Sequence, residues 1–244
     1  VHYFSDTLII NNLEFDHADI FDDLAAIQTQ FHHLVRTVPS NGSIIMPSSE
    51  SNIESVIKRG CWSKKHAFGG QKNDVWQFNL IEKDGSQFEI VSYDAKGEEE
   101  RAQVIWQQTG MHNVSNGLAA VIAAYQVGVS VSQACDALSD FVGVKRRMEV
   151  IYASKGVTLY DDFAHHPTAI KTTLEGLRAK VGDGIIVAII EPRSATMKMG
   201  IHQHALANSV DSADQVLWYQ NSAVDWGMEE LSSAIKIPST AMSS

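Results

Sequence analysis

The sequence has few of the features that mark secreted or membrane-spanning proteins. Its 244 residues include only two cysteines, Cys61 and Cys135, which are far apart and form no CxxC pair. Isolated thiols of this kind are typical of a reducing compartment rather than of a disulfide framework, and we expect a cytoplasmic protein. No signal peptide is recognisable, and no apolar run reaches the roughly 20 residues that cross a bilayer.

Basic residues are also scarce. The 19 Lys and Arg residues are outnumbered by 29 Asp and Glu residues, which gives a formal net charge of −10. A nucleic-acid backbone would be repelled by this charge unless a local basic stripe existed. The one dense basic cluster, Lys145-Arg146-Arg147, is too short for that role, and we therefore expect no nucleic-acid partner.

What the chain does have is enough apolar sequence for a sizeable core. Hydrophobic residues make up 44% and charged residues 20% of the chain, and its length suits one large or two ordinary domains. The sequence begins at Val1 without a methionine and ends at Ser244. We expect it to be a piece of a longer protein.

The hydrophobic pattern changes near a hinge predicted at residues 143–147. Before it, we expect strands at residues 8–10 and 43–46, helices at 19–35, 116–127 and 132–141, and an antiparallel β segment between 61 and 104. After it, strands at 157–160, 185–190 and 216–219 alternate with helices at 167–179 and 204–209. This βαβαβ order predicts an α/β fold with a doubly wound parallel sheet, in which 185–190 is a fully covered strand.

The most informative motif follows the strand at 157–160. Asp161 and Asp162 end that strand, and a turn with His165 and His166 leads to a helix that Pro167 opens. Loops at the carboxyl ends of strands form the ligand crevice of an open α/β sheet, and a carboxylate there can accept hydrogen bonds from a ribose. Ordinary turn chemistry of Asp is the alternative for the acids, and helix capping is the alternative for the histidines.

Other candidate side chains lie at the start of a predicted helix, at the hinge and on the loop after the first strand. Asn113 and Asn116 flank the predicted helix at 116–127, where a carboxamide can match an adenine edge or cap the helix. Arg147, at the hinge, can reach a phosphate or remain a solvated charge. His17, on the loop after the first strand, can ligate a divalent metal or be a surface histidine.

A further loop follows the strand at 185–190. Arg193 and Lys198 lie on it, and either side chain can pair with a carboxylate or a phosphate.

Four segments occur together in an order that resembles the Mur ligase family: residues 11–19, 112–116, 147–149 and 161–168. The resemblance covers essentially the whole chain. It implies that residues 1–144 form the C-terminal half of a P-loop-type central ATPase domain with an antiparallel β segment. Residues 145–244 then form an incomplete, Rossmann-like C-terminal ligase domain.

Within the family, the runs at residues 15–24, 31–36 and 191–200 are closest to the branch that acts in peptidoglycan recycling. The resemblance implies an ATP- and Mg²⁺-dependent ligase that joins the tripeptide L-Ala-γ-D-Glu-meso-diaminopimelate to UDP-N-acetylmuramate through an acyl phosphate. It further implies a cytoplasmic enzyme of cell-wall biogenesis, and we expect a monomer.

The same resemblance implies roles for individual residues. His17 would ligate a magnesium ion, and Arg147 would contact the γ-phosphate; both are therefore candidate catalytic residues. The remaining nucleotide contacts would come from His112, Asn113, Asn116, Asp162 and His165. Arg193 and Lys198 would contact the incoming peptide.

The chain also departs from the family pattern. It contains no GxxxxGK[ST] phosphate loop, and the magnesium-binding Glu that precedes the family's histidine is absent. We therefore expect that these 244 residues alone do not turn over ATP. Three alternatives stay open at this point: another Mur-type or folylpolyglutamate-type amide ligase, a metal-dependent phosphoesterase using Asp161, Asp162, His165 and His166, and a non-catalytic binding module.

Overall fold

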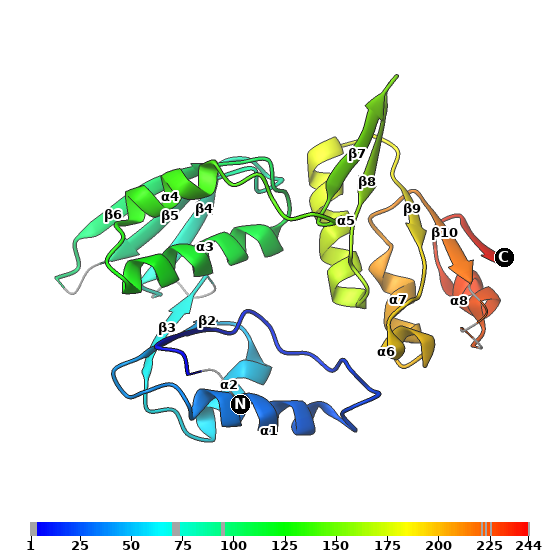
Figure 1. Cartoon of the computed structure of the whole chain (residues 1–244). Helices are drawn as coiled ribbons and strands as arrows, with labels where there is room; N and C mark the ends of the chain where they lie inside the picture. Colours follow the sequence, from blue (N-terminus) through cyan, green and yellow to red (C-terminus); the bar gives the residue numbers. More distant parts are fainter. Residues whose placement is uncertain are drawn as a thin grey trace. The chain divides into compact units, whose positions relative to one another are not determined.

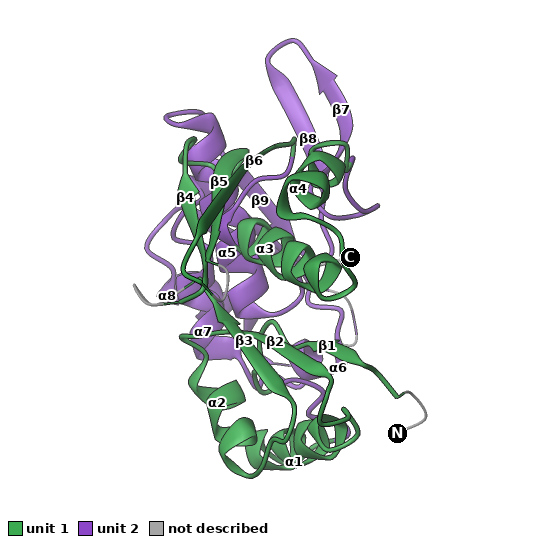
Figure 2. Cartoon of the chain, turned by 90° about the vertical axis from the view of Figure 1, so that its left-hand side faces the viewer, with its two compact units in different colours: residues 1–15, 21–107, 112–141 green, residues 16–20, 108–111, 142–244 purple. Residues whose placement is uncertain are grey.

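The computed structural model describes residues 4–69, 74–93, 96–220, 222, 224 and 226–243, so the two chain ends discussed above lie outside the described residues. The chain divides into two compact units (Figure 2). Unit 1 comprises residues 1–15, 21–107 and 112–141, and unit 2 comprises residues 16–20, 108–111 and 142–244. The last change of unit follows Phe141, immediately before the hinge predicted at residues 143–147.

Unit 1 is built on a six-stranded mixed sheet with the strands in sequence order (Figure 1). The parallel pairs join β1 to β2, β2 to β3 and β3 to β4, and the antiparallel pairs join β4 to β5 and β5 to β6. The strands are β1 (Thr7–Ile9), β2 (Ser43–Pro47), β3 (Lys64–Phe68), β4 (Trp76–Leu80), β5 (Gln87–Tyr93) and β6 (Glu99–Ile105).

Strand β2 is covered on both faces because its side chains alternate between two hydrophobic clusters. Ile45 packs with residues of α3 (Met111–Gln126) and α4 (Val131–Ser139), whereas Ile44 and Met46 pack with residues of α1 (Leu24–Val35) and α2 (Ser51–Lys58). All five residues of β2 are buried, as expected for a parallel strand between two helical layers.

Two helix boundaries differ from the sequence prediction. The first helix begins at Leu24 rather than at Asp19, because the Asp23 carboxylate accepts a hydrogen bond from the Ala26 amide at 2.8 Å and caps the helix there. Helix α3 begins at Met111 rather than at Asn116. Its first turn is already anchored by fully buried Val114, so packing against the sheet extends the helix.

The segment between β2 and β4 was the least well predicted. Helix α2 was missed, since its eight residues carry only three buried positions, Ile53, Val56 and Ile57. The prediction of antiparallel structure from residue 61 was wrong for β3, which runs parallel to β2; antiparallel pairing begins between β4 and β5. Helix α4 has the expected place, and a capping box of Ser130 and Gln133 fixes its start.

Unit 2 combines a three-stranded parallel sheet with a separate hairpin (Figure 1). The sheet has the order β11-β10-β9, and the antiparallel hairpin is β7-β8. The elements are β7 (Glu149–Ser154), β8 (Val157–Asp161), α5 (Pro167–Val181), β9 (Val187–Ile190), α6 (Ala195–Lys198), α7 (Gln203–Ser209), β10 (Gln215–Gln220), α8 (Met228–Ala234) and β11 (Ser239–Ser243).

The α/β class of unit 2 is confirmed, but two details differ from the prediction. Strand β8 pairs with β7 instead of joining the parallel sheet. Strand β9 is not covered on both faces: Ala188 is buried, whereas Val187 and Ile189 are 48% and 66% exposed. Among the described residues, the helices of unit 2 pack with the face that carries Ala188, Val216 and Trp218, so alternate side chains of β9 remain in solvent.

No helix in the described part of the chain is both long and apolar enough to cross a lipid bilayer.

Candidate functional site

The turn after β8 is organised by the Asp162 carboxylate. Its Oδ1 atom accepts a hydrogen bond from the Ala164 amide, and its Oδ2 atom accepts one from the Met148 amide, both at 2.8 Å. Asp162 therefore joins the basic segment, residues 145–148, to the turn that precedes α5. Asp161 makes an ion pair with Arg146, with 3.3 Å between Oδ2 and Nε. Asp162, the carboxylate predicted as a ribose ligand, thus has a structural function in this turn.

Phe163, next to Asp162, lies beside both arginines of the basic segment. The guanidinium carbons of Arg146 and Arg147 lie 5.2 and 5.5 Å from the centre of its ring. These distances are within the range of cation–π attraction. Phe163 lies within the motif that carries Asp162 and His165, but its apolar side chain gave no functional signal in the sequence.

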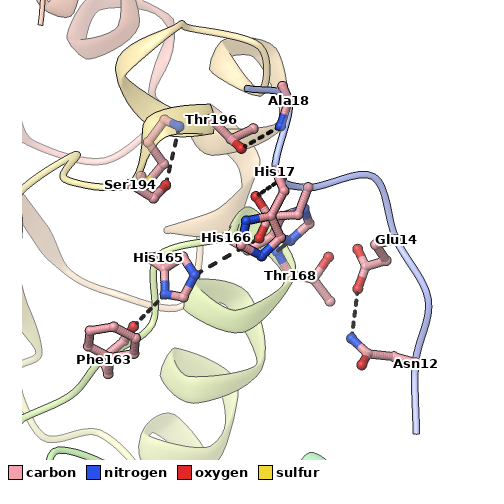
Figure 3. Close-up of polar contacts among 12 residues, drawn as sticks. Asn12, Glu14, His17, Ala18, Phe163, His165, His166, Thr168, Ser194 and Thr196 are labelled. Atoms are coloured by element: carbon pink, nitrogen blue, oxygen red, sulfur yellow. Dashed lines mark hydrogen bonds and ion pairs between the residues drawn. The ribbon is translucent and has the colours of Figure 1, made fainter. Parts of the chain in front are cut away.

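The two histidines of the turn point toward different partners (Figure 3). The His165 Nδ1 atom donates a hydrogen bond to the Phe163 carbonyl oxygen at 2.9 Å, and the Nε2 atom is 4.0 Å from the Asp16 carboxylate. His166 accepts a hydrogen bond from the Thr168 amide and caps α5, while its ring meets the edge of the His202 ring. The predicted helix cap is therefore confirmed for His166.

The segment that carries His17 is fixed by a buried threonine. The Thr196 hydroxyl accepts a hydrogen bond from the Ala18 amide at 3.2 Å, and Thr196 is 2% exposed (Figure 3). The Asp16 carboxylate accepts a hydrogen bond from the His17 amide at 2.8 Å. His17 itself is exposed and has a φ of 53°, a left-handed conformation that is uncommon for residues other than glycine.

Asp16 is held in its ionised form by this environment. Partial burial alone would favour the neutral acid. The hydrogen bond from Thr196, the amide of His17 and the charges of His17 and His166 outweigh it, so the pKa of Asp16 lies below its ordinary value. Sequence reasoning assigned no role to Asp16 and Thr196, because the hydrogen bond that joins them connects segments far apart in the chain.

The loop after β9 carries the two cationic candidates. Helix α6 is capped by the Ser194 hydroxyl, which accepts a hydrogen bond from the Met197 amide at 3.3 Å. Arg193 precedes this cap with its side chain 73% exposed, 3.8 Å from the Glu191 carboxylate. Lys198 is the last residue of α6 and is half-buried. Both cations thus flank one short, fixed turn at the carboxyl end of β9, as the sequence predicted.

In unit 1, the carboxamide candidates lie on the first turns of α3 rather than before it. Asn113 and His112 are half-buried, and Asn116 is exposed. The Asn11 side-chain amide donates a hydrogen bond to the side-chain Oδ1 atom of Asn116 at 2.6 Å, which ties the loop after β1 to α3. The prediction that Asn113 and Asn116 flank the helix start is therefore wrong. Their alternative role as helix caps does not apply.

The structure places the nine candidate residues in both units. Unit 1 holds His112, Asn113 and Asn116, and unit 2 holds His17, Arg147, Asp162, His165, Arg193 and Lys198. The direct contacts within unit 2 join the basic segment to the turn after β8, and that turn to the Asp16–Ala18 segment.

A divalent cation is not provided with a complete ligand set. Within the described ranges, no group of three or more His, Cys, Asp or Glu side chains is arranged to hold a metal ion. His17 is exposed and available as one ligand, whereas the Asp16 carboxylate beside it is engaged by Thr196 and the backbone. The described residues therefore do not by themselves fit a magnesium ion.

Comparison with known families identifies the class of protein that these two units define. The chain belongs to the Mur ligase family: the Mur ligase middle domain matches residues 5–124, and the Mur ligase, glutamate ligase domain matches residues 146–243.

Two curated relatives are similar to this chain over nearly its whole length. The chain is 48% identical over 239 residues to the UDP-N-acetylmuramate--L-alanyl-gamma-D-glutamyl-meso-2,6-diaminoheptandioate ligase of Escherichia coli (strain K12), covering 98% of this chain and 51% of the relative. It is 45% identical to the ligase of the same name from Haemophilus influenzae, covering 95% of this chain and 50% of the relative. The chain thus spans about half the length of the curated relatives that it matches.

Solved structures agree with this similarity. A murein peptide ligase from Psychrobacter arcticus 273-4 superposes with a TM-score of 0.69 at 47% identity, over 100% of this chain and 51% of that chain. The MurF ligase of Thermotoga maritima, solved in complex with ADP, gives a TM-score of 0.69 at 14% identity over 98% of this chain and 58% of that chain, which establishes a shared fold alone.

Proposed function

We propose that this chain is the middle and C-terminal part of an ATP-dependent peptide ligase. The full-length protein joins L-Ala-γ-D-Glu-meso-diaminopimelate to UDP-N-acetylmuramate in the cytoplasm, in peptidoglycan recycling. The observation that carries this proposal is the 48% identity, over 98% of the chain, to an Escherichia coli ligase named for these substrates. Residues 1–144 belong to the central domain and residues 145–244 to the C-terminal domain in this proposal.

The reaction proceeds in two steps that conserve atoms and charge. The muramyl carboxylate attacks the γ-phosphorus of ATP, and ADP leaves as the acyl phosphate forms. The free amine of the tripeptide then attacks the acyl carbon, loses a proton and expels inorganic phosphate from the tetrahedral intermediate. The protein contributes mainly by positioning the reactants and by stabilising the negative charge that develops on the transferred phosphoryl group.

Contacts to the nucleotide are assigned to two of the family segments, residues 112–116 and 161–168. Asn113 and Asn116, on the first turns of α3, offer carboxamide donors and acceptors to the purine, and His112 belongs to the same motif. Asp162 and His165 are assigned to the ribose side of the nucleotide. Each Asp162 oxygen already accepts one backbone amide, and a carboxylate oxygen has a second lone pair for a ribose hydroxyl.

Arg147 is assigned to the γ-phosphate because its guanidinium is exposed and carries a fork of donors that suits phosphate oxygens. His17 is assigned as one ligand of Mg²⁺. A bound magnesium ion would neutralise phosphate charge, and His17 would contribute a ring nitrogen to it. Since the described residues lack a full ligand set, His17 is the one protein ligand that this proposal gives to the ion.

The peptide acceptor is assigned to the turn after β9. The substrate tripeptide carries several carboxylates. Arg193 is a cation just before α6, and Lys198 is a cation at the last position of α6. We expect Arg193→Ala and Lys198→Ala in the full-length ligase to raise the KM for tripeptide by roughly tenfold, as for loss of a charge-assisted hydrogen bond. The KM for ATP is expected to stay unchanged, which serves as the internal control.

The choice of acceptor tests the proposal against a second member of the family. The chain is also 32% identical, over 216 residues, to the UDP-N-acetylmuramate--L-alanine ligase of Caldicellulosiruptor bescii, over 86% of this chain and 45% of that relative. Purified full-length protein is incubated with ATP, Mg²⁺, UDP-N-acetylmuramate and either tripeptide or L-alanine. We expect ligation of the tripeptide at a far higher kcat/KM. Preferential ligation of L-alanine would overturn the proposed substrate.

The 244-residue chain by itself is expected not to turn over ATP, since it contains no GxxxxGK[ST] phosphate loop. The assay above, run with this chain in place of the full-length protein, should give no ADP and no ligated product. Substrate-dependent ADP release by this chain would contradict the expectation.

A further inference from the structure

The backbone on both sides of Arg147 is strained. Arg146 has a φ of 59° and Met148 a φ of 51°, so two residues with side chains adopt the left-handed conformation. Such conformations persist only where surrounding contacts over-determine the backbone, and they concentrate at functional sites. The conformations of Arg146 and Met148, on either side of Arg147, are therefore imposed by surrounding contacts rather than by local preference.

The contacts that impose this conformation come from acidic side chains. The Arg146 amide donates a hydrogen bond to the Glu149 carboxylate at 2.9 Å, and the Met148 amide donates one to Asp162 at 2.8 Å. Each strained residue is thus held by its own carboxylate, and Arg147 lies between the two anchored positions. This arrangement fixes the point from which the Arg147 side chain leaves the backbone.

The direction of that side chain is then influenced by Phe163. The Arg147 guanidinium carbon lies 5.5 Å from the centre of the ring, and the ring is 47% exposed. An aromatic face attracts a cation through its quadrupole and need not accept a hydrogen bond from it. The guanidinium can therefore rest against the ring while its N–H donors stay available for phosphate oxygens.

We propose that Phe163 is a positioning residue for Arg147: its ring orients the guanidinium toward the terminal phosphate of the nucleotide. This inference rests on the proposed function, in which Arg147 contacts the γ-phosphate. It assigns a role to a side chain that carries no hydrogen-bonding group of its own. Asp162 takes part through the backbone, by anchoring Met148 beside the arginine.

The test compares two nucleotides in the full-length ligase. ADP lacks the phosphate that Arg147 contacts, whereas the non-hydrolysable analogue AMP-PNP has a phosphoryl group in the γ position. In Phe163→Leu we expect AMP-PNP to bind about 2- to 5-fold more weakly, as for the loss of an exposed cation–π contact. We expect a smaller loss of ADP affinity, through the His165 ring that lies 5.0 Å from the Phe163 ring, and a fall of kcat by about tenfold or more. Phe163→Tyr keeps the ring and should restore both values.

A double-mutant cycle identifies the arginine through which the ring acts. Arg146 lies as close to the ring as Arg147, at 5.2 Å, and so provides a matched control. Phe163→Leu should have no further effect on AMP-PNP affinity in an Arg147→Ala background and its full effect in an Arg146→Ala background. Additive effects with Arg147→Ala would overturn the inference.

The other outcomes are equally decisive. An equal loss of ADP and AMP-PNP affinity in Phe163→Leu would mean that the ring contacts the base or sugar, or only supports the turn, and the inference fails. If the unaltered full-length protein binds neither nucleotide, the proposed function fails first. Should Phe163→Leu not fold, Phe163→Met in the full-length ligase is the second test: it removes the aromatic face but keeps an apolar side chain, and an AMP-PNP affinity equal to the parent's overturns the inference.

Discussion

Gly176 of α5 packs so closely against the backbone of Gly110 that a Cβ atom on Gly176 would lie 2.7 Å from the Gly110 Cα atom and 2.9 Å from its nitrogen. Both residues belong to unit 2, although 66 positions of sequence separate them. The obstacle is backbone rather than a flexible side chain, so the helix cannot accept a larger residue at this position without moving.

Gly176→Ala is therefore expected to destabilise the protein. An alanine in a helix interior normally adds about 1 kcal/mol of stability relative to glycine. Here the overlap with Gly110 should outweigh that gain, with a net loss of about 1–3 kcal/mol in the free energy of unfolding. Urea denaturation measures it. Lys171→Ala, which removes an exposed ion pair with Glu175 on the same helix, is the control and should change stability by about 0.5 kcal/mol or less. A stabilised Gly176→Ala variant would contradict the close packing.

Thr196→Val is expected to release the segment that carries His17. Valine has the shape of threonine but cannot accept the hydrogen bond from the Ala18 amide or donate one to Asp16. Hydrogen–deuterium exchange at the Ala18 amide should become about two- to tenfold faster. The pKa of Asp16 should rise toward its ordinary value because a donor to its ionised form is lost. Thr196→Ser retains the hydroxyl and should exchange as the parent chain does; equal rates in Thr196→Val would exclude the contact.

Asp214 makes the folding stability of unit 2 depend on pH in the acidic range. The backbone amide of Ile186 and the guanidinium of Arg178 both donate to its Oδ2 atom, at 2.7 and 2.6 Å, and hold the pKa of Asp214 below its ordinary value. A carboxyl whose pKa is lowered by folding contributes stability that is fully present above its unfolded pKa of about 4. That contribution is lost as the pH falls through the folded pKa.

We therefore expect the urea midpoint of the parent chain to fall on acidification below about pH 4, and to fall less steeply in Asp214→Asn. Asp211→Asn removes an exposed carboxylate from the same loop and should keep the parent's acid dependence. Denaturation curves between neutral pH and about pH 3 decide the matter. An Asp214→Asn curve parallel to the parent's at every pH would disprove the assigned linkage.

The two cysteines should differ in reactivity. Burial, with a smaller contribution from the charges of Asp136 and Glu100, raises the pKa of the Cys135 thiol to about 12. Cys61 is only half-buried. Alkylation by iodoacetamide near neutral pH should modify Cys61 alone in the native chain and both cysteines in urea, since the thiolate is the reactive form. Mass spectrometry counts the adducts; native Cys61→Ser should gain none. Modification of Cys135 at the rate of Cys61 would show that the core around α4 is open.

Local sequence patterns predicted some helices and strands well and others poorly. Local patterns located α4, α5 and β10 to within a few residues, because each has an apolar periodicity and clear ends. They failed for α2 and β3. Both are short: α2 takes its structure from burial against β2 and its neighbours, and β3 takes its structure from parallel pairing with β2, rather than from their own periodicity. Strand β8 was placed correctly along the chain, but its partner was not, because a run of four residues with high strand propensity does not specify what it pairs with.

The sequence by itself determined which motifs the chain carries and in which order, and that was enough to indicate the Mur ligase family. Only the tertiary structure decided how those motifs are supported. It brought the Asp162 carboxylate to the Met148 amide and the Phe163 ring to Arg147, and it placed the Thr196 hydroxyl against the Ala18 amide. The physical reason is that a hydrogen bond or a ring contact depends on distance in space, which local composition and periodicity do not specify for residues far apart in the chain.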